Sequence, residues 1–79
     1  MKIVDTDLVT FLLLKIEATK MQLDLSNRLY DALPDTRTLS ASIQTRKKIL
    51  EYQSELLVER GKHIETLLKL ENELKEVLP

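Results

Sequence analysis

The sequence predicts an all-α protein: an antiparallel helical hairpin with long helices, which dimerises into a four-helix bundle or a coiled coil. Two observations carry this prediction. Glycine occurs once and proline twice in 79 residues, so few positions interrupt a helix. In the second half, apolar residues recur every seven residues on two neighbouring registers, a spacing that holds a helix face against a partner helix. The first register comprises Ile43, Leu50, Leu57, Ile64 and Leu78, and the second Ile49, Leu56, Leu70 and Val77.

The first helix is expected over residues 5–33. Asp5, Thr6 and Asp7 can each cap its first turn, and Pro34 disfavours a helical conformation at the residue before it. The apolar residues cover more than one face of this helix, which predicts more than one neighbour. The main series is Phe11, Leu14, Ala18, Met21, Leu25 and Ala32, and Leu8, Leu12, Ile16, Leu29 and Leu33 widen it.

A turn is expected over residues 34–37. Asp35, Thr36 and Thr38 are all candidate caps for the helix that follows, because their side chains accept hydrogen bonds from free backbone N–H groups. The start of that helix is harder to place, since serines at positions 40 and 42 weaken its first turn.

The second helix is expected to run without a break over residues 38–77. Gly61 is its only interior breaker and costs about 1 kcal/mol relative to alanine, which is too little to end a helix with good periodicity on both sides. The alternative is a three-helix domain that turns at residues 60–62. Glu65 and Lys69 form a favourable pair four residues apart.

The unequal lengths of the two helices predict an overhang. The second helix is about twelve residues longer, so roughly three turns at its C-terminal end are left unmatched and need a second copy as cover. The expected core comprises Leu8, Phe11, Leu12, Leu14, Ile16, Ala18, Met21, Leu25, Leu29, Ala32, Ile43, Leu50, Leu57, Ile64, Leu67, Leu74 and Leu78. The apolar residues of the expected overhang are Leu67, Leu70, Leu74, Val77 and Leu78.

The amino-acid composition argues against a disulfide, a metal site and an enzymatic active site. The chain has no cysteine and one histidine, His63, so neither a disulfide nor a zinc site is expected. There is no glycine-rich phosphate loop and no nucleophile arrangement. We therefore expect no cofactor, no metal and no enzyme; the enzyme alternative needs a polar pocket at a dimer interface, lined by Arg28, Arg46 and Arg60. The N-terminal apolar run lacks the features of a signal peptide, and no membrane span is present, so we expect a cytoplasmic protein.

Charge is unevenly spread along the chain. The formal net charge is −1, yet residues 36–48 carry four cations and no acid, namely Arg37, Arg46, Lys47 and Lys48. A solvated helix start is the favoured interpretation of this basic island, and nucleic-acid binding is the alternative. Arg46, Gln53 and Arg60 share a register with two leucines, so their stems are expected to flank the helix contact, or else to recognise an acidic partner.

The expected function is a non-catalytic protein–protein interaction module: a small adaptor, chaperone-like or inhibitory regulator that docks a helical face on a partner protein. The partners are a second copy, as a homodimer, and another protein. A regulator that binds nucleic acid through the basic island is the alternative. The residues expected to bind the partner are Leu56, Leu70 and Val77 for apolar contact, and Arg46, Lys47, Lys48 and Arg60 for charge complementarity.

Overall fold

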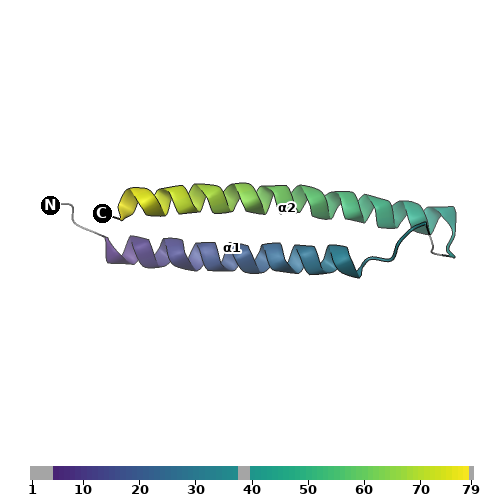
Figure 1. Ribbon diagram of the computed structural model, residues 1–79, viewed down its shortest axis with the longest axis horizontal. Coiled ribbons are helices and arrows are strands. Elements are labelled where there is room, and N and C mark those ends of the chain that lie inside the picture. The colour runs from purple at the N-terminus through teal and green to yellow at the C-terminus, as the bar shows by residue number, and fades with distance from the viewer. Residues whose placement is uncertain (1–4, 38–39, 79) are drawn as a thin grey trace.

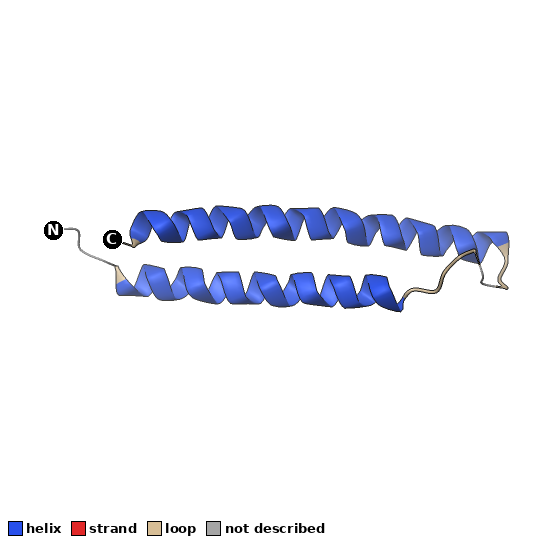
Figure 2. Cartoon of the chain, in the orientation of Figure 1, coloured by secondary structure: helices blue, strands red, loops and turns tan. Residues whose placement is uncertain are grey.

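The computed structural model describes residues 5–37 and 40–78. They form two helices, α1 (Thr6–Ala32) and α2 (Ile43–Val77), that lie antiparallel in a rod of 65 × 14 × 14 Å (Figure 1). The described residues contain no strand, and helix occupies all of them except the connection and the ends (Figure 2). The predicted all-α helical hairpin is confirmed.

The ends of α1 follow the local chemistry of the sequence. The Asp5 carboxylate accepts a hydrogen bond from the backbone N–H of Leu8 at 3.1 Å and so caps the first turn. At the other end Leu33, which precedes Pro34, is extended with φ −69° and ψ 139°. The proline therefore ends α1 where the sequence predicts.

The start of α2 lies further along the chain than expected. Ser42 caps the helix, because its Oγ accepts from the backbone N–H of Thr45 at 3.2 Å. Asp35 is no helix cap: its carboxylate accepts from the backbone N–H of Arg37 at 2.9 Å and shapes the turn instead. Thr38, the expected first residue of the helix, lies outside the described residues.

The helices meet along one line of residues from each, spaced alternately by three and four, which we call the seam. Its buried apolar residues are Leu12 and Ile16 of α1 and Leu56 and Leu70 of α2. Half-buried residues continue the same spacing on both helices. They are Val9 and Leu23 on α1, Leu33 directly after α1, and Arg46, Ile49, Gln53, His63, Leu67, Leu74 and Val77 on α2.

The structure corrects the predicted core. The register that begins at Ile43 and continues through Leu50 and Leu57 is exposed on the hairpin, and so is the main α1 series. The seam uses the neighbouring registers instead. Both helices carry two apolar stripes, and the apolar content of a stripe does not say which neighbour it faces. The expected core residues that are exposed are Leu8, Phe11, Leu14, Ala18, Met21, Leu25, Leu29, Ala32, Ile43, Leu50, Leu57, Ile64 and Leu78.

The predicted overhang is at the wrong end of α2. The C-terminal turns of α2 lie beside the N-terminal turns of α1, and the unmatched part is the start of α2 (Figure 1). The connection of ten residues, 33–42, is long enough to let α2 begin beyond the end of α1. Consequently Leu67, Leu74 and Val77 pack against the cluster of Leu12, Ile16 and Leu70 rather than standing free.

The seam changes character along its length. It is apolar near the chain termini, whereas Thr19 and Ser26 of α1 are buried further along, with Gln53 and His63 half-buried on α2. The Thr19 hydroxyl is satisfied locally, because it donates to the Lys15 carbonyl at 2.7 Å. Apolar burial, and with it the attraction between the helices, is therefore concentrated at the end that holds the termini.

Helix α2 is continuous through Gly61, as predicted. A Cβ added at Gly61 would meet no atom within 4 Å, so the hairpin itself does not require a glycine there. The predicted pair of Glu65 and Lys69 is present, with Nζ 3.6 Å from Oε1. Both side chains of this pair are well exposed, so the pair contributes at most a few tenths of a kcal/mol.

Two equivalent truncations in α1 test the seam. Leu12 is 2% exposed and Leu14 is 66% exposed. We expect Leu12→Ala to lower the free energy of unfolding by about 2–4 kcal/mol, because it opens a cavity in the thin core, and Leu14→Ala to lower it by less than ~0.5 kcal/mol. Urea unfolding followed by circular dichroism measures both. Equal losses would contradict this assignment of the seam.

Candidate interaction surface

The outer face of α1 carries a row of exposed apolar side chains, which we call the α1 stripe: Phe11, Leu14, Ala18, Met21 and Leu25. Their alternating steps of four and three residues place them on one side of the helix, away from the seam. The four large ones are 53–68% exposed. Single exposed apolar residues are ordinary, whereas a contiguous row of them is typical of interaction surfaces.

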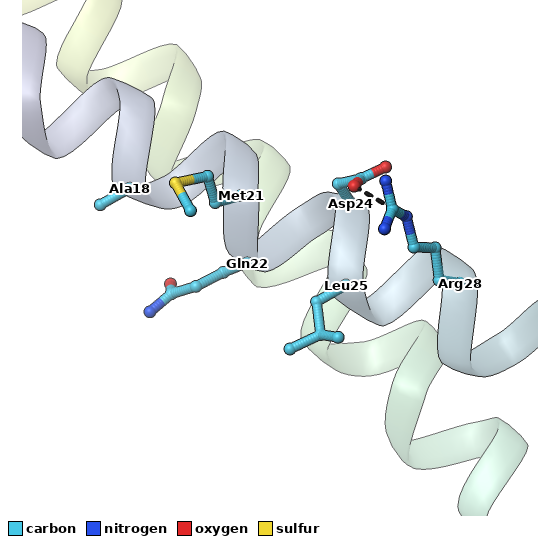
Figure 3. A pocket seen from close by; sticks show the side chains of 6 residues that line it. All are labelled: Ala18, Met21, Gln22, Asp24, Leu25 and Arg28. Carbon is cyan, nitrogen blue, oxygen red and sulfur yellow. Dashed lines mark ion pairs between the residues drawn. The ribbon is translucent and has the colours of Figure 1, made fainter.

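Figure 3 shows the centre of the α1 stripe. Ala18, Met21 and Leu25 line an open hollow with Gln22, and an ion pair between Asp24 and Arg28 borders it with Nε 3.0 Å from Oδ2. All of these residues come from α1, so the hollow is an open surface between side chains of one helix. A shallow surface of this kind suits another helix better than a small molecule.

Charged side chains lie beside the apolar centre of the α1 stripe. The Lys15 ammonium lies 5.2 Å from the centroid of the Phe11 ring, within range of a cation–π contact. Arg28 takes the next place in the three- and four-residue spacing after Leu25, and its side chain is 78% exposed beside Asp24. The stripe is thus an apolar strip with charge at its edges, as in the core and rim of a protein interface.

A second exposed row, the α2 stripe, comprises Ile43, Leu50, Leu57, Ile64, Leu68 and Leu78. These side chains are 42–83% exposed. The seven-residue spacing of this face also includes two small residues, Ser54 and Gly61, and three charged ones, Lys47, Glu71 and Lys75. It has the alternating three- and four-residue pattern of a helix–helix contact, yet it faces away from α1.

The two stripes do not meet in the hollow beside the seam. A hollow on one side joins α1 and α2, and the α1 stripe reaches it through Leu25. No residue of the α2 stripe lines that hollow, which consists of Gln22, Leu25, Ser26, Leu29, Glu59, Lys62 and His63. On that side, therefore, the α1 stripe borders charged and polar residues of α2, and the hairpin presents two separate apolar faces.

The apolar residues predicted to bind a partner lie inside the hairpin. Leu56 is 3% and Leu70 5% exposed in the seam, and Val77 packs against the core cluster. Within this hairpin their side chains hold α1 and α2 together. Contact between these three residues and a partner protein stays a prediction that requires the helices to separate.

The predicted charged residues take different environments. Lys47, Lys48 and Arg60 are exposed, whereas Arg46 is half-buried in the seam with a buried Nε atom. The sequence pattern assigns the exposed stripes to the core, because they are about as rich in large apolar residues as the seam. The presence of two such stripes on each helix, when a hairpin can cover only one, was the signal that could have identified an exposed surface.

Arg37, the first cation of the basic island, is engaged in the turn. Its guanidinium lies 3.3 Å from both carboxylate oxygens of Asp35. The backbone N–H of Arg37, and then its side chain, lower the pKa of the Asp35 carboxyl below the ordinary value, and Asp35 in turn raises the pKa of Arg37. The island therefore spans a folded turn and two faces of α2 rather than one patch.

Within residues 5–37 and 40–78, no group of three or more His, Cys, Asp or Glu side chains is placed to hold a metal ion. Neither α1 nor α2 has the length and apolar content needed to span a membrane. Comparisons with protein-family models, curated proteins and solved structures find no match to this chain.

The turn makes a testable prediction about pH. The pKa of Asp35 is lowered in the folded chain, so the turn contacts are present at neutral pH and are lost as the pH falls through that lowered pKa. Arg37→Ala should raise the pKa of Asp35 only part of the way to its ordinary value, because the backbone N–H remains. Carboxyl chemical shifts in an NMR titration measure this, and an unchanged pKa would contradict the side-chain contact.

Proposed function

We propose that this protein is a non-catalytic interaction module that docks the α1 stripe on a helix of another protein. One observation supports the proposal above the others. Among the described residues, four apolar side chains are buried, whereas sixteen large ones are exposed. A hairpin that serves only its own stability would bury most of its large apolar residues, whereas this one exposes them, four of them in the α1 stripe.

Binding follows from the physical character of the α1 stripe. The side chains recur at the spacing with which one helix meets another, so an amphipathic helix laid along α1 covers all of them. Phe11 supplies a large anchor and Met21 a flexible one that adapts to an uneven surface. Arg28 and Lys15, beside the strip, favour a partner helix with acidic residues flanking its apolar face.

The rest of the hairpin acts as a support for this surface. The seam holds α1 along α2, so the stripe is already helical before it meets its partner and little conformational entropy is lost on binding. Such a preformed face suits an adaptor, a chaperone-like protein or an inhibitory regulator, each of which acts by occupying a partner surface. A second copy bound at the other stripe makes the four-helix dimer predicted by the sequence.

Site-specific photo-crosslinking tests the proposal. We place a benzophenone amino acid at Met21 in the α1 stripe and, as the matched control, at Lys20 of the same helix. Both residues are exposed, but Lys20 is neither three nor four residues from any member of the stripe and points to another side of α1. After irradiation in cells of the natural host, we expect the Met21 position to yield one dominant adduct with a different protein and the Lys20 position to yield little of it.

A second substitution checks that the stripe itself binds. Leu14→Glu, combined with the probe at Met21, should reduce the adduct at least tenfold, because a carboxylate in the interface loses its hydration. The circular dichroism of the Leu14→Glu variant should show the same helical content as the parent chain, since Leu14 is exposed. Adducts formed only with the protein's own copy, or equally from both probe positions, would refute the proposed function.

A further inference from the structure

We propose that the α2 stripe binds the α2 stripe of a second copy of this chain, with the two α2 helices antiparallel. The proposal concerns a different face from the α1 stripe and does not depend on what binds there. The occupant is inferred from three properties of the α2 stripe: its exposed area, the placement of its small residues and the placement of its charges.

The stripe has the extent that a dimer requires. It runs from Ile43 to Leu78, nearly the whole of α2, whose 35 residues span about 52 Å. Its six large side chains are each 42–83% exposed. Over two copies this apolar surface, with its neighbours, is on the order of 1,000 Å², which is the lower limit for a specific interface and fits a dimer that dissociates on dilution.

The small and large residues of the α2 stripe are placed so that it packs against an antiparallel copy of itself. In antiparallel helices, the two kinds of position in a three- and four-residue repeat face each other. In one register, Gly61 faces Leu57 of the second copy, and Ser54 faces Ile64. The missing side chain at Gly61 is explained by this pairing, because the space beside it is open in the hairpin and Leu57 of the other copy fills it.

The charges within the stripe favour the same register over a parallel one. The antiparallel register brings Leu50 against Leu68 and sets Lys47 opposite Glu71, which is the only acid in the stripe. A parallel pairing instead places each of these residues against its own copy, so that like charges meet.

The antiparallel register also sets Ile43 beside the stem of Lys75 of the other copy. It brings Glu51 near Glu65 of the other copy and Arg60 near its own copy. Water weakens these repulsions, because the side chains are exposed.

Pairing through α2 leaves the other face of the hairpin open. The α1 stripe lies on the outer face of α1, and the hollow that it reaches through Leu25 contains no residue of the α2 stripe, so a second copy bound to α2 does not cover it. The dimer therefore carries two α1 stripes on one rigid body. A partner that has two matching helices would gain avidity from both contacts at once, without any new contact in either hairpin.

The solution molar mass of the full chain tests the pairing. By light scattering over a concentration series, we expect a dimer that dissociates on dilution. Leu57→Glu should raise the dissociation constant about 100-fold or more, because it buries carboxylates at the centre of the interface. The matched control Leu14→Glu, on the α1 stripe, should remain a dimer, and circular dichroism should show that both variants keep their helices.

Several results of this experiment would overturn the proposal. A parent chain that is monomeric at every concentration excludes self-association. A dimer that survives Leu57→Glu but is lost in Leu14→Glu places the contact on α1. Because the crosslinking experiment scores adducts with a different protein and this one scores the mass of the chain alone, failure of one leaves the other standing.

Cysteine pairing tests the antiparallel register. The chain has no cysteine, so each introduced thiol is unique. When Leu50→Cys and Leu68→Cys chains are mixed and oxidised, we expect a disulfide between the two different chains, since these positions face each other. Disulfides formed mainly between identical chains indicate parallel pairing and refute the register.

A charge reversal gives an independent check of the same register. Lys47→Glu should weaken the dimer several-fold, because it sets two acids opposite each other at both ends of the symmetric contact. Adding Glu71→Lys in the same chain restores both pairs and should recover the parent dissociation constant within about twofold. A double variant as weak as the single one would show that these residues do not face each other.

Discussion

The rest of the structure depends on the seam, where α1 and α2 meet along residues spaced alternately by three and four. This spacing keeps one face of each helix turned towards the other over the length of the contact. Its apolar content is small, however, because buried Thr19 and Ser26 of α1, with half-buried Gln53 and His63 of α2, occupy positions where leucines would bind more tightly. The seam aligns the helices but buries little apolar surface.

Because the seam buries little apolar surface, much of the apolar surface of the hairpin is left on its outer faces. A chain of 79 residues is near the lower size limit for an independent core, and it commonly needs oligomerisation or a partner for full stability. Here ten large apolar side chains lie exposed on the two outer stripes, where the seam does not cover them. This distribution of apolar residues between the seam and the outer stripes explains both the modest core of the hairpin and the surfaces that we assign to partner binding and self-association.

The ends of the helices show where the nearby residues alone are sufficient to predict a helix boundary. Asp5 and Pro34 act within one turn of their own positions, so the bounds of α1 follow from the sequence. The start of α2 was less certain because several residues before it can cap a helix. Ser42 takes that role, whereas Asp35 is already engaged with Arg37 in the turn. Several residues of equal capping capacity stand before α2, so local chemistry alone does not select among them.

By itself the sequence determined that the chain is helical, that α1 ends before Pro34 and that α2 continues through Gly61, because these depend on local propensity and spacing. The candidate surface could be predicted only in part: its residues were identified as apolar stripes but assigned to the core. Only the tertiary structure decided which stripe of each helix forms the seam and which end of α2 is unmatched. The physical reason is that a helix with two apolar stripes is stable against either, and the choice depends on the fit of the other helix and on the reach of the connection.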